Sequence, residues 1–438
     1  MKKSLLLLIL VYCHSISAQR LPVLNLIKYD TTDLKGYYFF TASSNLIITD
    51  KETNIIFYKP WNFDYTFTLA PNKEMFLGTN DFAYLLDSTF KIIDSFVCKK
   101  GVKNDPHDAL ALPEGHILLL GTENVKMVFS DLPDFKERWK SDTAFIPTAV
   151  IQEQDAQHNV VFEWHAKDHF LLSDADSFFD NRDNPPEWTH SNALALDGDG
   201  NILLSSRNLN EITKINRNNG FIMWRFGGKH NEFKFVNCPV PFYGQHDIKR
   251  LTNGHITLFD NGQNSVSHGA RAMEFELDEK NKIATLVWSY TYDKNSSSNG
   301  RGNVQRLSDG NTLISYGKHF SGDVCFLIVN SSGKKLMQVN GPSVYRVTNY
   351  QDLPFQLHRP VINCFDSAGV KYFDAGAGYK SYKWNTGDTT RIIKITNQGS
   401  YSVFVPYGDG GFISSEKYRM EDIYKPCESG SSPRNKKE

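Results

Sequence analysis

The stretch His190-Ser-Asn-Ala-Leu-Ala-Leu-Asp-Gly-Asp-Gly-Asn-Ile-Leu-Leu204 decides the fold. It joins two apolar segments through a turn rich in glycine and aspartate, which is typical of two antiparallel strands connected by a hairpin. Three clear copies and two weaker ones occur elsewhere: His107–Leu120, His246–Leu258 and Asn303–Ile314, then Tyr37–Thr49 and Tyr65–Leu77. A strand–turn–strand unit that recurs along a chain predicts a repeat architecture made of β-sheets.

The clearer units continue with a third and a fourth strand. These strands are expected at Glu211–Ile215, Ala272–Leu277 and Cys325–Val329, and at Phe162–Trp164, Met223–Trp224 and Val287–Trp288. Four short antiparallel strands in six copies predict an all-β, six-bladed β-propeller, which we place at residues 19–355. Unrelated hairpins in a sandwich are the alternative, and they are disfavoured because the strand order recurs within each unit.

The beginning of the chain differs from the repeats. Residues 1–18 combine Lys2-Lys3, the apolar run Leu5–Tyr12 and the small-residue end Ser15–Ala18, which predicts a signal peptide cleaved after Ala18 or one residue earlier. We therefore expect an exported protein, periplasmic or secreted. No run of eighteen apolar residues follows, so no transmembrane segment is expected.

The end of the chain also lacks the repeat pattern. Short alternating strands between glycine turns predict a small immunoglobulin-like β-sandwich at 360–424, and a Ser-, Lys- and Glu-rich composition predicts a flexible tail at 425–438. Cys364 and Cys427 flank this domain and are the expected disulfide pair. Its phrase Tyr379–Asp388 resembles immunoglobulin-like C-terminal modules of exported Bacteroidetes proteins.

Composition and missing motifs exclude several classes of function. The 438 residues are 40% hydrophobic and 22% charged, with a formal net charge of -1, which argues against a disordered chain and against broad nucleic-acid binding. No Cys-x-x-Cys motif indicates zinc, and no Gly-rich lysine loop indicates a bound nucleotide. We expect neither a metal nor a cofactor.

Propeller geometry predicts where a site would form. Each innermost strand starts at one face, its hairpin turns at the other, and the second strand returns, so strand-one starts, strand-two ends and strand-three starts share one mouth. Candidate site residues at these positions are His107, His190, Asn192, His246 and Asn303, then Arg207, Asp260, Asn261 and His319, and finally Arg271.

Histidines at similar points of different repeats are the strongest functional indication. Imidazole suits acid–base chemistry, nucleophilic attack and metal binding near neutral pH. The alternative is structural, with each histidine bonded to a carbonyl of the neighbouring blade. Arg207 and Arg271 would offer planar forks to an anionic oxyacid, or would instead form salt bridges to Asp260 or Glu211.

Two further clusters admit a metal interpretation. Asp197-Gly-Asp199-Gly-Asn201 begins like a calcium loop, but Asn208 stands where the closing acid belongs, so a hairpin turn is favoured. The cluster His165–His169 lies in a loop, where a solvated connection is favoured over a metal site or a place in the mouth.

In combination, six phrases resemble the exported bacterial arylsulfate sulfotransferases over roughly residues 100–320. They are Glu187–Ala193, Leu204–Asn208, Ile222–Gly228, Gly244–Asp247, Phe259–Gly262 and Ala270–Asp278. The resemblance implies a funnel that moves a sulfuryl group from a phenolic sulfate ester to a phenolic acceptor, through a sulfated histidine and without a nucleotide donor. It implies that His190 and His246 bind and polarise the sulfate and that Arg271 stabilises its oxygens. The strand-end positions at the same mouth predict further substrate contacts by His107, Asn192, Arg207, Asp260, Asn261 and Asn303.

One position departs from that pattern. The nucleophilic histidine is expected to start a strand in a later blade, but aligning Leu307 with Leu251 places Gly302 opposite His246. The nucleophile is then His246 or His319, with His107 as a further candidate. The alternative is a propeller that binds an anionic aromatic or glycan ligand without turnover. A sulfatase is disfavoured, because the chain has no Cys-x-Pro-x-Arg or Ser-x-Pro-x-Arg motif.

Overall fold

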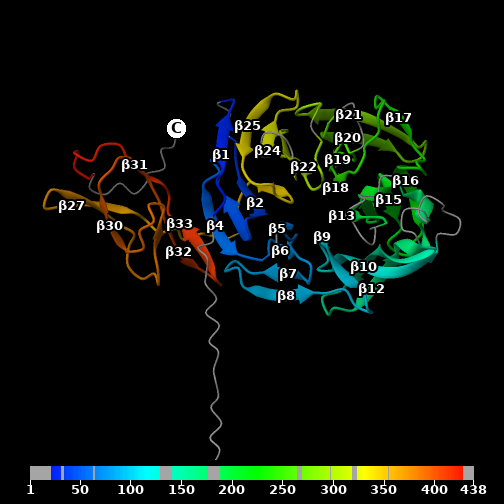
Figure 1. Ribbon diagram of the computed structural model, residues 1–438, viewed down its shortest axis with the longest axis horizontal. Helices are drawn as coiled ribbons and strands as arrows, with labels where there is room; N and C mark the ends of the chain where they lie inside the picture. The colour runs from blue at the N-terminus through cyan, green and yellow to red at the C-terminus, as the bar shows by residue number, and fades with distance from the viewer. Residues whose placement is uncertain are drawn as a thin grey trace, which may run out of the picture.

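Six β-sheets stand around a central axis in the computed structural model (Figure 1). The structure describes residues 21–427 except 31–33, 63–64, 129–140, 176–187, 264–268, 296, 318–322 and 354. The predicted signal peptide, residues 428–438 of the predicted tail and the candidate His319 lie outside the described residues. Within the described part, no helix is long and apolar enough to span a bilayer.

Blades 2, 3 and 4 each consist of four consecutive antiparallel strands, ordered from the axis outward. Blade 2 contains β5 (Phe67–Leu69), β6 (Met75–Gly78), β7 (Ala83–Leu86) and β8 (Ile92–Phe96). Blade 3 contains β9 (Lys103–Ala111), β10 (Ile117–Val128), β11 (Thr143–Gln154) and β12 (Val160–His165). Blade 4 contains β13 (Ser191–Leu196), β14 (Ile202–Ser206), β15 (Glu211–Ile215) and β16 (Ile222–Gly227). Three 3-10 turns lie beside them: η1 (Ala166–Asp168), η2 (Leu172–Asp174) and η3 (Arg207–Leu209).

Blades 5 and 6 each carry a fifth, outer strand. Blade 5 contains β18 (His246–Arg250), β19 (Ile256–Asp260), β20 (Arg271–Asp278), β21 (Ile283–Thr291) and the parallel strand β17 (Lys234–Val236). Blade 6 contains β22 (Asn303–Arg306), β23 (Thr312–Ser315), β24 (Val324–Val329), β25 (Lys335–Asn340) and β1 (Asn25–Lys28). The N-terminal strand β1 is therefore the outer edge of the last blade.

Blade 1 corrects one sequence expectation. Its innermost strand is β26 (Val347–Tyr350), followed outward by β2 (Tyr37–Ala42), β3 (Asn45–Thr49) and β4 (Ile55–Pro60). The unit Tyr37–Thr49 thus supplies the second and third strands, not the first and second, because the C-terminal end of the propeller provides the inner strand. Neighbouring blades contact one another in sequence, and blade 6 contacts blade 1, so the six-bladed prediction is confirmed.

The hydrophobic core lies between adjacent blades, which explains the alternation in the opening sequence stretch. Leu194 of β13 packs toward blade 3 with Leu118 and Leu204, whereas Ala193 and its strand neighbour Ala195 face blade 5. Successive side chains of a strand point to opposite faces, so both faces of the sheet are buried. This burial on both sides is why the inner strands contain almost no exposed apolar residues.

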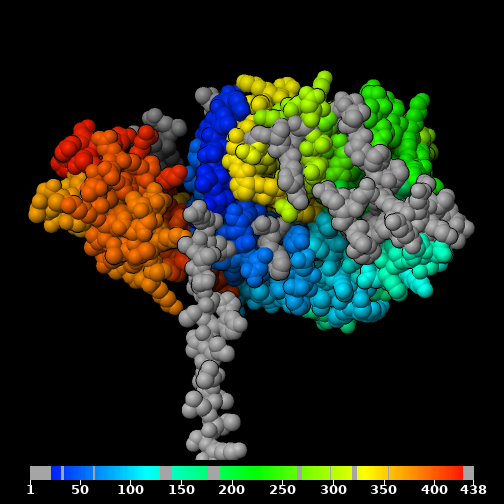
Figure 2. Space-filling model, viewed as in Figure 1, coloured from blue at the N-terminus to red at the C-terminus, as the bar shows by residue number. Residues whose placement is uncertain are grey.

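The C-terminal region forms a module beside blade 1 (Figure 2). Its strands are β27 (Asn363–Ser367), β28 (Val370–Asp374), β29 (Lys383–Trp384), β30 (Ile392–Ile395), β31 (Gly399–Tyr401), β32 (Val403–Tyr407), β33 (Gly411–Ser414) and β34 (Tyr418–Met420). Strand β33 pairs with β4, so blade 1 continues into the module as one seven-stranded sheet. The predicted Cys364–Cys427 disulfide is confirmed, and the immunoglobulin-like assignment stays a prediction.

Candidate functional site

The mouth of the propeller is shaped by bulges at the start of three inner strands. The pairing register shifts at residues 105–108 of β9, at Asn192 of β13 and at Asp247 of β18. A bulge inserts unpaired residues that bend the strand and redirect side chains. His190 and Asp247 also have positive φ angles of 43° and 57°, a conformation that non-glycine residues adopt mainly where the surroundings enforce it.

These bulges bring the three sequence-predicted histidines together. The ring centroids of His107 and His190 are 4.7 Å apart, and those of His190 and His246 are 6.4 Å apart. The three rings come from blades 3, 4 and 5, separated by more than fifty residues in the chain at each step. The predicted gathering of imidazoles at one mouth is therefore present in the structure.

His246 is the most enclosed of the three histidines. Its Nδ1 lies 2.8 Å from Oδ1 of Asn261 and 3.2 Å from the carbonyl oxygen of Gly244. Both partners are acceptors, so Nδ1 carries the proton and Nε2 keeps its lone pair. Burial lowers the pKa of His246 well below its ordinary value, and the charges of Arg207, His190 and His107 lower it further. The ring is a neutral imidazole at physiological pH.

His107 has a different partner. Its Nδ1 lies 2.6 Å from Oδ1 of Asp105, and the same oxygen accepts the His107 backbone N–H at 2.9 Å. Asp105 is buried, whereas the side chain of His107 is 22% exposed. The carboxylate fixes the ring orientation and favours a proton on Nδ1.

The two sequence-predicted arginines differ in their engagement. Arg271 is buried, and its Nε and Nη2 donate to Asp260 at 2.9 and 2.7 Å, with further bonds to the carbonyl oxygens of Val240 and Pro241. This salt bridge is the alternative that the sequence left open. Arg207 lies in η3, donates to the amide oxygens of Asn208 and Gln263, and is close enough to His246 to depress its pKa. Arg207 is therefore the better placed of the two to meet an anion beside His246.

The predicted contact residues Asn192 and Asn303 connect neighbouring blades. Nδ2 of Asn192 donates to the carbonyl oxygen of Gln245, and Asn303 exchanges two hydrogen bonds with the backbone of Val347. Both asparagines are buried. These hydrogen bonds join the inner strands of neighbouring blades, so a direct substrate contact by either residue stays a prediction.

Sequence reasoning missed two mouth residues that precede the ring-closing strand β26. Arg346 is buried and donates to Oδ1 of Asp108 at 2.7 Å and to the carbonyl oxygen of Asn192 at 3.0 Å. The ring of Tyr345 lies 6.2 Å from that of His107. The first repeat could have indicated these residues. Because it lacks an inner strand of its own, its blade must receive that strand from the far end of the chain.

A third residue that the sequence reasoning missed is Arg301, which lies between two glycines at the start of blade 6. Its guanidinium carbon is 6.0 Å from the Tyr345 ring centre, and its backbone oxygen accepts a hydrogen bond from Asn261, the partner of His246. Among the described residues, no carboxylate forms an ion pair with Arg301. A cation held against an aromatic face beside the histidines is suited to meet an anionic ligand.

The structure gives a physical reason for glycine at position 302. Gly302 has a φ of +94°, and a Cβ there would lie 2.6 Å from the Phe259 ring and 2.8 Å from the carbonyl oxygen of Ser315. A histidine at this position therefore requires a different local backbone. Gly300 lies beside His246, where a Cβ would be 3.7 Å from Nε2, so the reactive edge of that ring faces a residue without a side chain.

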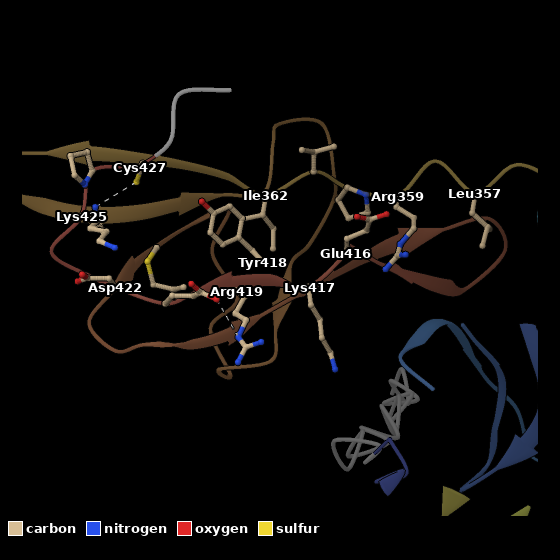
Figure 3. Close-up of a pocket in the computed structure, with 16 residues that line it drawn as sticks. Leu357, Arg359, Ile362, Glu416, Lys417, Tyr418, Arg419, Asp422, Lys425 and Cys427 are labelled. Carbon is tan, nitrogen blue, oxygen red and sulfur yellow. Dashed lines mark hydrogen bonds and ion pairs between the residues drawn. The ribbon is translucent and has the colours of Figure 1, made fainter. Parts of the chain in front are cut away.

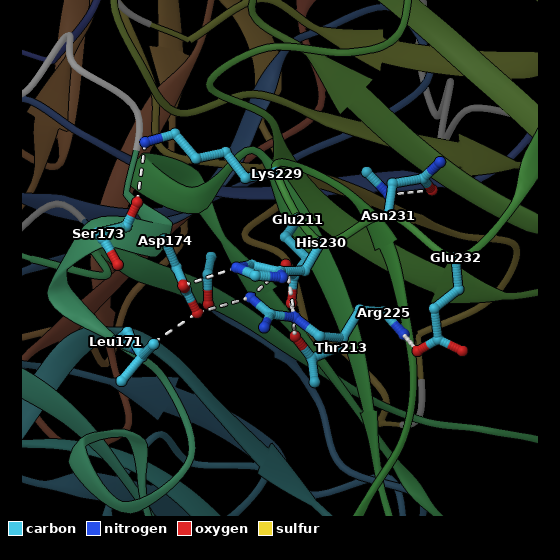
Figure 4. Close-up of polar contacts among 12 residues, drawn as sticks. Leu171, Ser173, Asp174, Glu211, Thr213, Arg225, Lys229, His230, Asn231 and Glu232 are labelled. Carbon is cyan, nitrogen blue, oxygen red and sulfur yellow. Dashed lines mark hydrogen bonds and ion pairs between the residues drawn. The ribbon is translucent and has the colours of Figure 1, made fainter.

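A second polar network lies at the start of β15 (Figure 4). Glu211 pairs with Arg225, and Arg225 also reaches Asp174 of η2 at 3.1 Å. His230 contacts the other oxygen of Asp174 at 2.9 Å. Burial raises the pKa of Glu211. Because the guanidinium of Arg225 bridges the buried carboxylates of Glu211 and Asp174, this network attaches η2 to blade 4, and its opposite charges are paired with one another.

The possible metal positions are filled by basic side chains. Nζ of Lys214 lies 2.7 Å from Asp197, 2.8 Å from Asp199 and 2.9 Å from Glu279, so an ammonium occupies the predicted hairpin turn where a calcium loop would hold its ion.

Two other clusters have protein partners as well. Among the described residues, one further group has metal-ligand spacing, Glu114, His116 and Glu153, and Arg217 binds both of its carboxylates. In the loop cluster, His165 pairs with Glu123 at 2.6 Å and His169 stacks on Trp164. None of these clusters belongs to the gathering of histidines at the mouth.

A groove of about 670 Å³ lies elsewhere, in the C-terminal module between β34 and the segment 357–362 (Figure 3). Both acidic and basic side chains line it, among them Glu416, Lys417 and Arg419. It contains none of the sequence-predicted site residues. The mouth of the propeller therefore remains the candidate functional site.

Fold and site together define an all-β propeller whose mouth gathers imidazole and guanidinium groups suited to an anion. The model of the arylsulfotransferase (ASST) family matches residues 23–338, and the chain belongs to this family. The matched range contains the three histidines and both sequence-predicted arginines. No curated protein sequence matches the chain.

Solved structures resemble the chain only in outline. A protein of unknown function from Bacteroides caccae is 11% identical, with a TM-score of 0.47, and the match covers 73% of this chain and 100% of that one. The periplasmic gluconolactonase of Pseudomonas aeruginosa is 10% identical, with a TM-score of 0.42, and the match covers 89% and 100%. Neither likeness bears on the function of this chain.

Proposed function

We propose that the protein transfers a sulfuryl group from a phenolic sulfate ester to a phenolic acceptor without a nucleotide donor, after export directed by residues 1–18. The observation that carries the proposal is the state of His246. A neutral, buried imidazole whose Nδ1–H is held by Asn261 presents the lone pair of Nε2 as a nucleophile. Family membership supports sulfuryl transfer as the reaction.

The proposed reaction has two half-reactions. In the first, Nε2 of His246 bonds to sulfur while the bond from sulfur to the aryl oxygen breaks, which releases a phenolate. In the second, the oxygen of the acceptor phenol bonds to sulfur as its proton is lost to solvent, and the nitrogen–sulfur bond breaks, which regenerates the imidazole. The phenolate released in the first half-reaction takes up a proton from solvent, so protons balance over one turnover. Negative charge on the nonbridging oxygens is stabilised by fixed cationic donors, for which Arg207 and Arg301 are the candidates.

Purified protein incubated with a nitrophenyl sulfate tests the proposal. Nitrophenol release that depends on an added phenol, with a sulfated acceptor as product, is the expected result. With donor alone, peptide mass mapping should find one added sulfuryl group on His246. If the release of nitrophenol does not depend on the added phenol, the proposed transferase activity is wrong.

A non-catalytic propeller is the second candidate, because Gly302 stands where the family pattern places a histidine. Calorimetric titration with a phenolic sulfate in the same preparation separates the two functions. Binding without nitrophenol release would identify a binding propeller, and binding with release would identify the transferase.

A further inference from the structure

Arg346 lies where the blades converge. It directly precedes β26, the inner strand of blade 1, and it is buried. Its Nη1 donates to Asp108 of blade 3 at 2.7 Å, its Nη2 donates to the carbonyl oxygen of Asn192 of blade 4 at 3.0 Å, and its Nε lies 3.8 Å from Oδ1 of Asp247 of blade 5. A side chain of blade 1 meets blades 3, 4 and 5 at once because it reaches the axis that the inner strands surround.

The three residues that Arg346 contacts share a further property. Each lies in the bulge of a strand that carries a mouth histidine: Asp108 directly follows His107, Asn192 is two residues after His190, and Asp247 directly follows His246. A bulge sets the direction of the side chains beside it. The direction of each histidine ring therefore depends on a bulge that the same guanidinium contacts.

The two carboxylates also reach the next blade along the ring. Oδ2 of Asp108 accepts the backbone N–H of Leu194 in blade 4 at 2.8 Å, and Oδ2 of Asp247 accepts that of Val304 in blade 6 at 3.3 Å. Both acids are buried, as is Arg346. A guanidinium presents its donors in a fixed planar fork, so it sets the separation of the groups that it contacts as well as pairing with their charge.

We propose that Arg346 is the positioning residue of the mouth, which holds the bulges of blades 3, 4 and 5 at the spacing that brings the three histidine rings together. The inference rests on the proposed function, because sulfuryl transfer requires these rings at fixed distances from one ester. Closure of the propeller thereby completes the site, since the segment before the last inner strand supplies the guanidinium that three other blades share. In this role Arg346 acts through the bulge residues and not by contact with the ester.

Exchange of the guanidinium for an ammonium tests this role. Arg346→Lys keeps a positive charge beside Asp108, but an ammonium lacks the planar fork that reaches three bulges at once. NMR spectra of histidine-labelled protein should show shifted imidazole signals for His107, His190 and His246. At a temperature where the variant is folded, kcat with a nitrophenyl sulfate and a phenol should fall about 10²-fold, with a smaller change in KM, because the reacting groups are misplaced.

Arg250→Lys is the matched control at the hairpin end. The side chain of Arg250 is 11% exposed and bridges two carboxylates of different blades, those of Asp197 in blade 4 and Glu279 in blade 5. This variant should lower the melting temperature because it weakens a largely buried ion pair. It should leave the imidazole signals of the mouth histidines and kcat at their wild-type values.

If Arg346→Lys does not fold, the double variant Arg346→Gln with Asp108→Asn decides. It removes one positive and one negative charge together, and Asp247 keeps Lys249 at 3.3 Å, so no carboxylate loses its only cation. The same imidazole signals should shift. Mouth signals or a kcat at the wild-type value in a folded variant would show that Arg346 only joins the blades and would overturn the inference. The spectra require no turnover, so they decide the role of Arg346 even if an inactive wild-type protein contradicts the proposed function.

Discussion

The two faces of the propeller, the hairpin end and the mouth, carry similar charged residues, but these residues have different kinds of neighbours. At the hairpin end, Lys214 is surrounded by three carboxylates, and Arg250 bonds to Asp197 and Glu279. Arg217 is held by Glu153 and Glu114 in the same way. Each of these basic groups has acidic partners within hydrogen-bond distance. These ion pairs stabilise the contacts within and between blades.

At the mouth, basic groups instead face one another. His246 lies close enough to Arg207, His190 and His107 for all three to lower its pKa. The acids nearby serve particular partners: Asp105 holds His107, Asp260 holds Arg271, and Asp108 holds Arg346. The blade repeat therefore places polar strand ends at both faces of the propeller. Only at the mouth do basic groups lie next to one another, which suits that face to an anionic ester.

Replacing His246 should produce the largest difference between the two ends. His246→Asn removes the lone pair of Nε2 but keeps a polar group near Asn261, so kcat should fall on the order of 10⁴-fold or more while the fold persists. Steady-state rates with a nitrophenyl sulfate and a phenol measure this loss.

His255→Asn is the control for that experiment, because His255 lies in the hairpin turn of the same blade and pairs with Glu274 at 2.7 Å. Its kcat should stay within about twofold of wild type, since it contacts no mouth residue. An active His246→Asn variant would remove His246 from the mechanism and leave His107 and His319 as the candidates.

The hairpin end should respond in stability rather than in activity. Lys214→Ala leaves Asp197, Asp199 and Glu279 facing one another without their ammonium, which should cost about 3 kcal/mol of unfolding free energy. Urea unfolding followed by tryptophan fluorescence measures it. At temperatures where the variant is folded, its kcat should match the wild type; a drop in kcat would mean that the two ends are coupled.

Removing Arg207 should have a smaller effect that is confined to the mouth. Arg207→Gln removes a cation next to His246, so kcat/KM should fall about 10²-fold, and the pKa of His246 should rise because one of the charges that depress it is gone. NMR titration of the imidazole measures the second effect.

The comparison variant for Arg207 is Arg217→Gln, at the opposite end of blade 4. It should lower the melting temperature, because Glu153 is buried, and leave kcat/KM unchanged. Equal catalytic losses in both variants would contradict the distinction between the two ends.

The sequence predicted the blades and the gathering of histidines because both depend on local pattern. Alternation and turn residues fix each hairpin, and a recurring hairpin fixes the direction of each strand end, so His107, His190 and His246 had to share a face. Burial on both faces of each strand made this pattern clear along most of the propeller.

The rest depended on contacts between distant segments. Tyr345 and Arg346 reach the mouth because β26 pairs with β2 across about three hundred residues, and no local pattern marks that closure. Arg271 and Asn303 occupy the expected strand ends, but their bonds go to Asp260 and to Val347. Which partner a polar side chain takes is decided by the neighbouring blade, so position alone could not separate binding groups from groups that join the blades.

The smallest expected effect concerns the pH dependence of stability. An unfolded histidine titrates near pH 6.5, whereas burial and Arg207 hold the pKa of folded His246 well below that value. As the pH falls below about 6.5, the unfolded chain binds a proton here that the folded chain does not, so the unfolding free energy decreases. His246→Gln removes this contribution. Its melting temperature relative to wild type should therefore rise between pH 8 and pH 5.5 in parallel calorimetric scans. If the difference in melting temperature stays constant with pH, the folded imidazole takes up its proton as readily as the unfolded one. That result would contradict the proposal of a neutral imidazole nucleophile at the mouth.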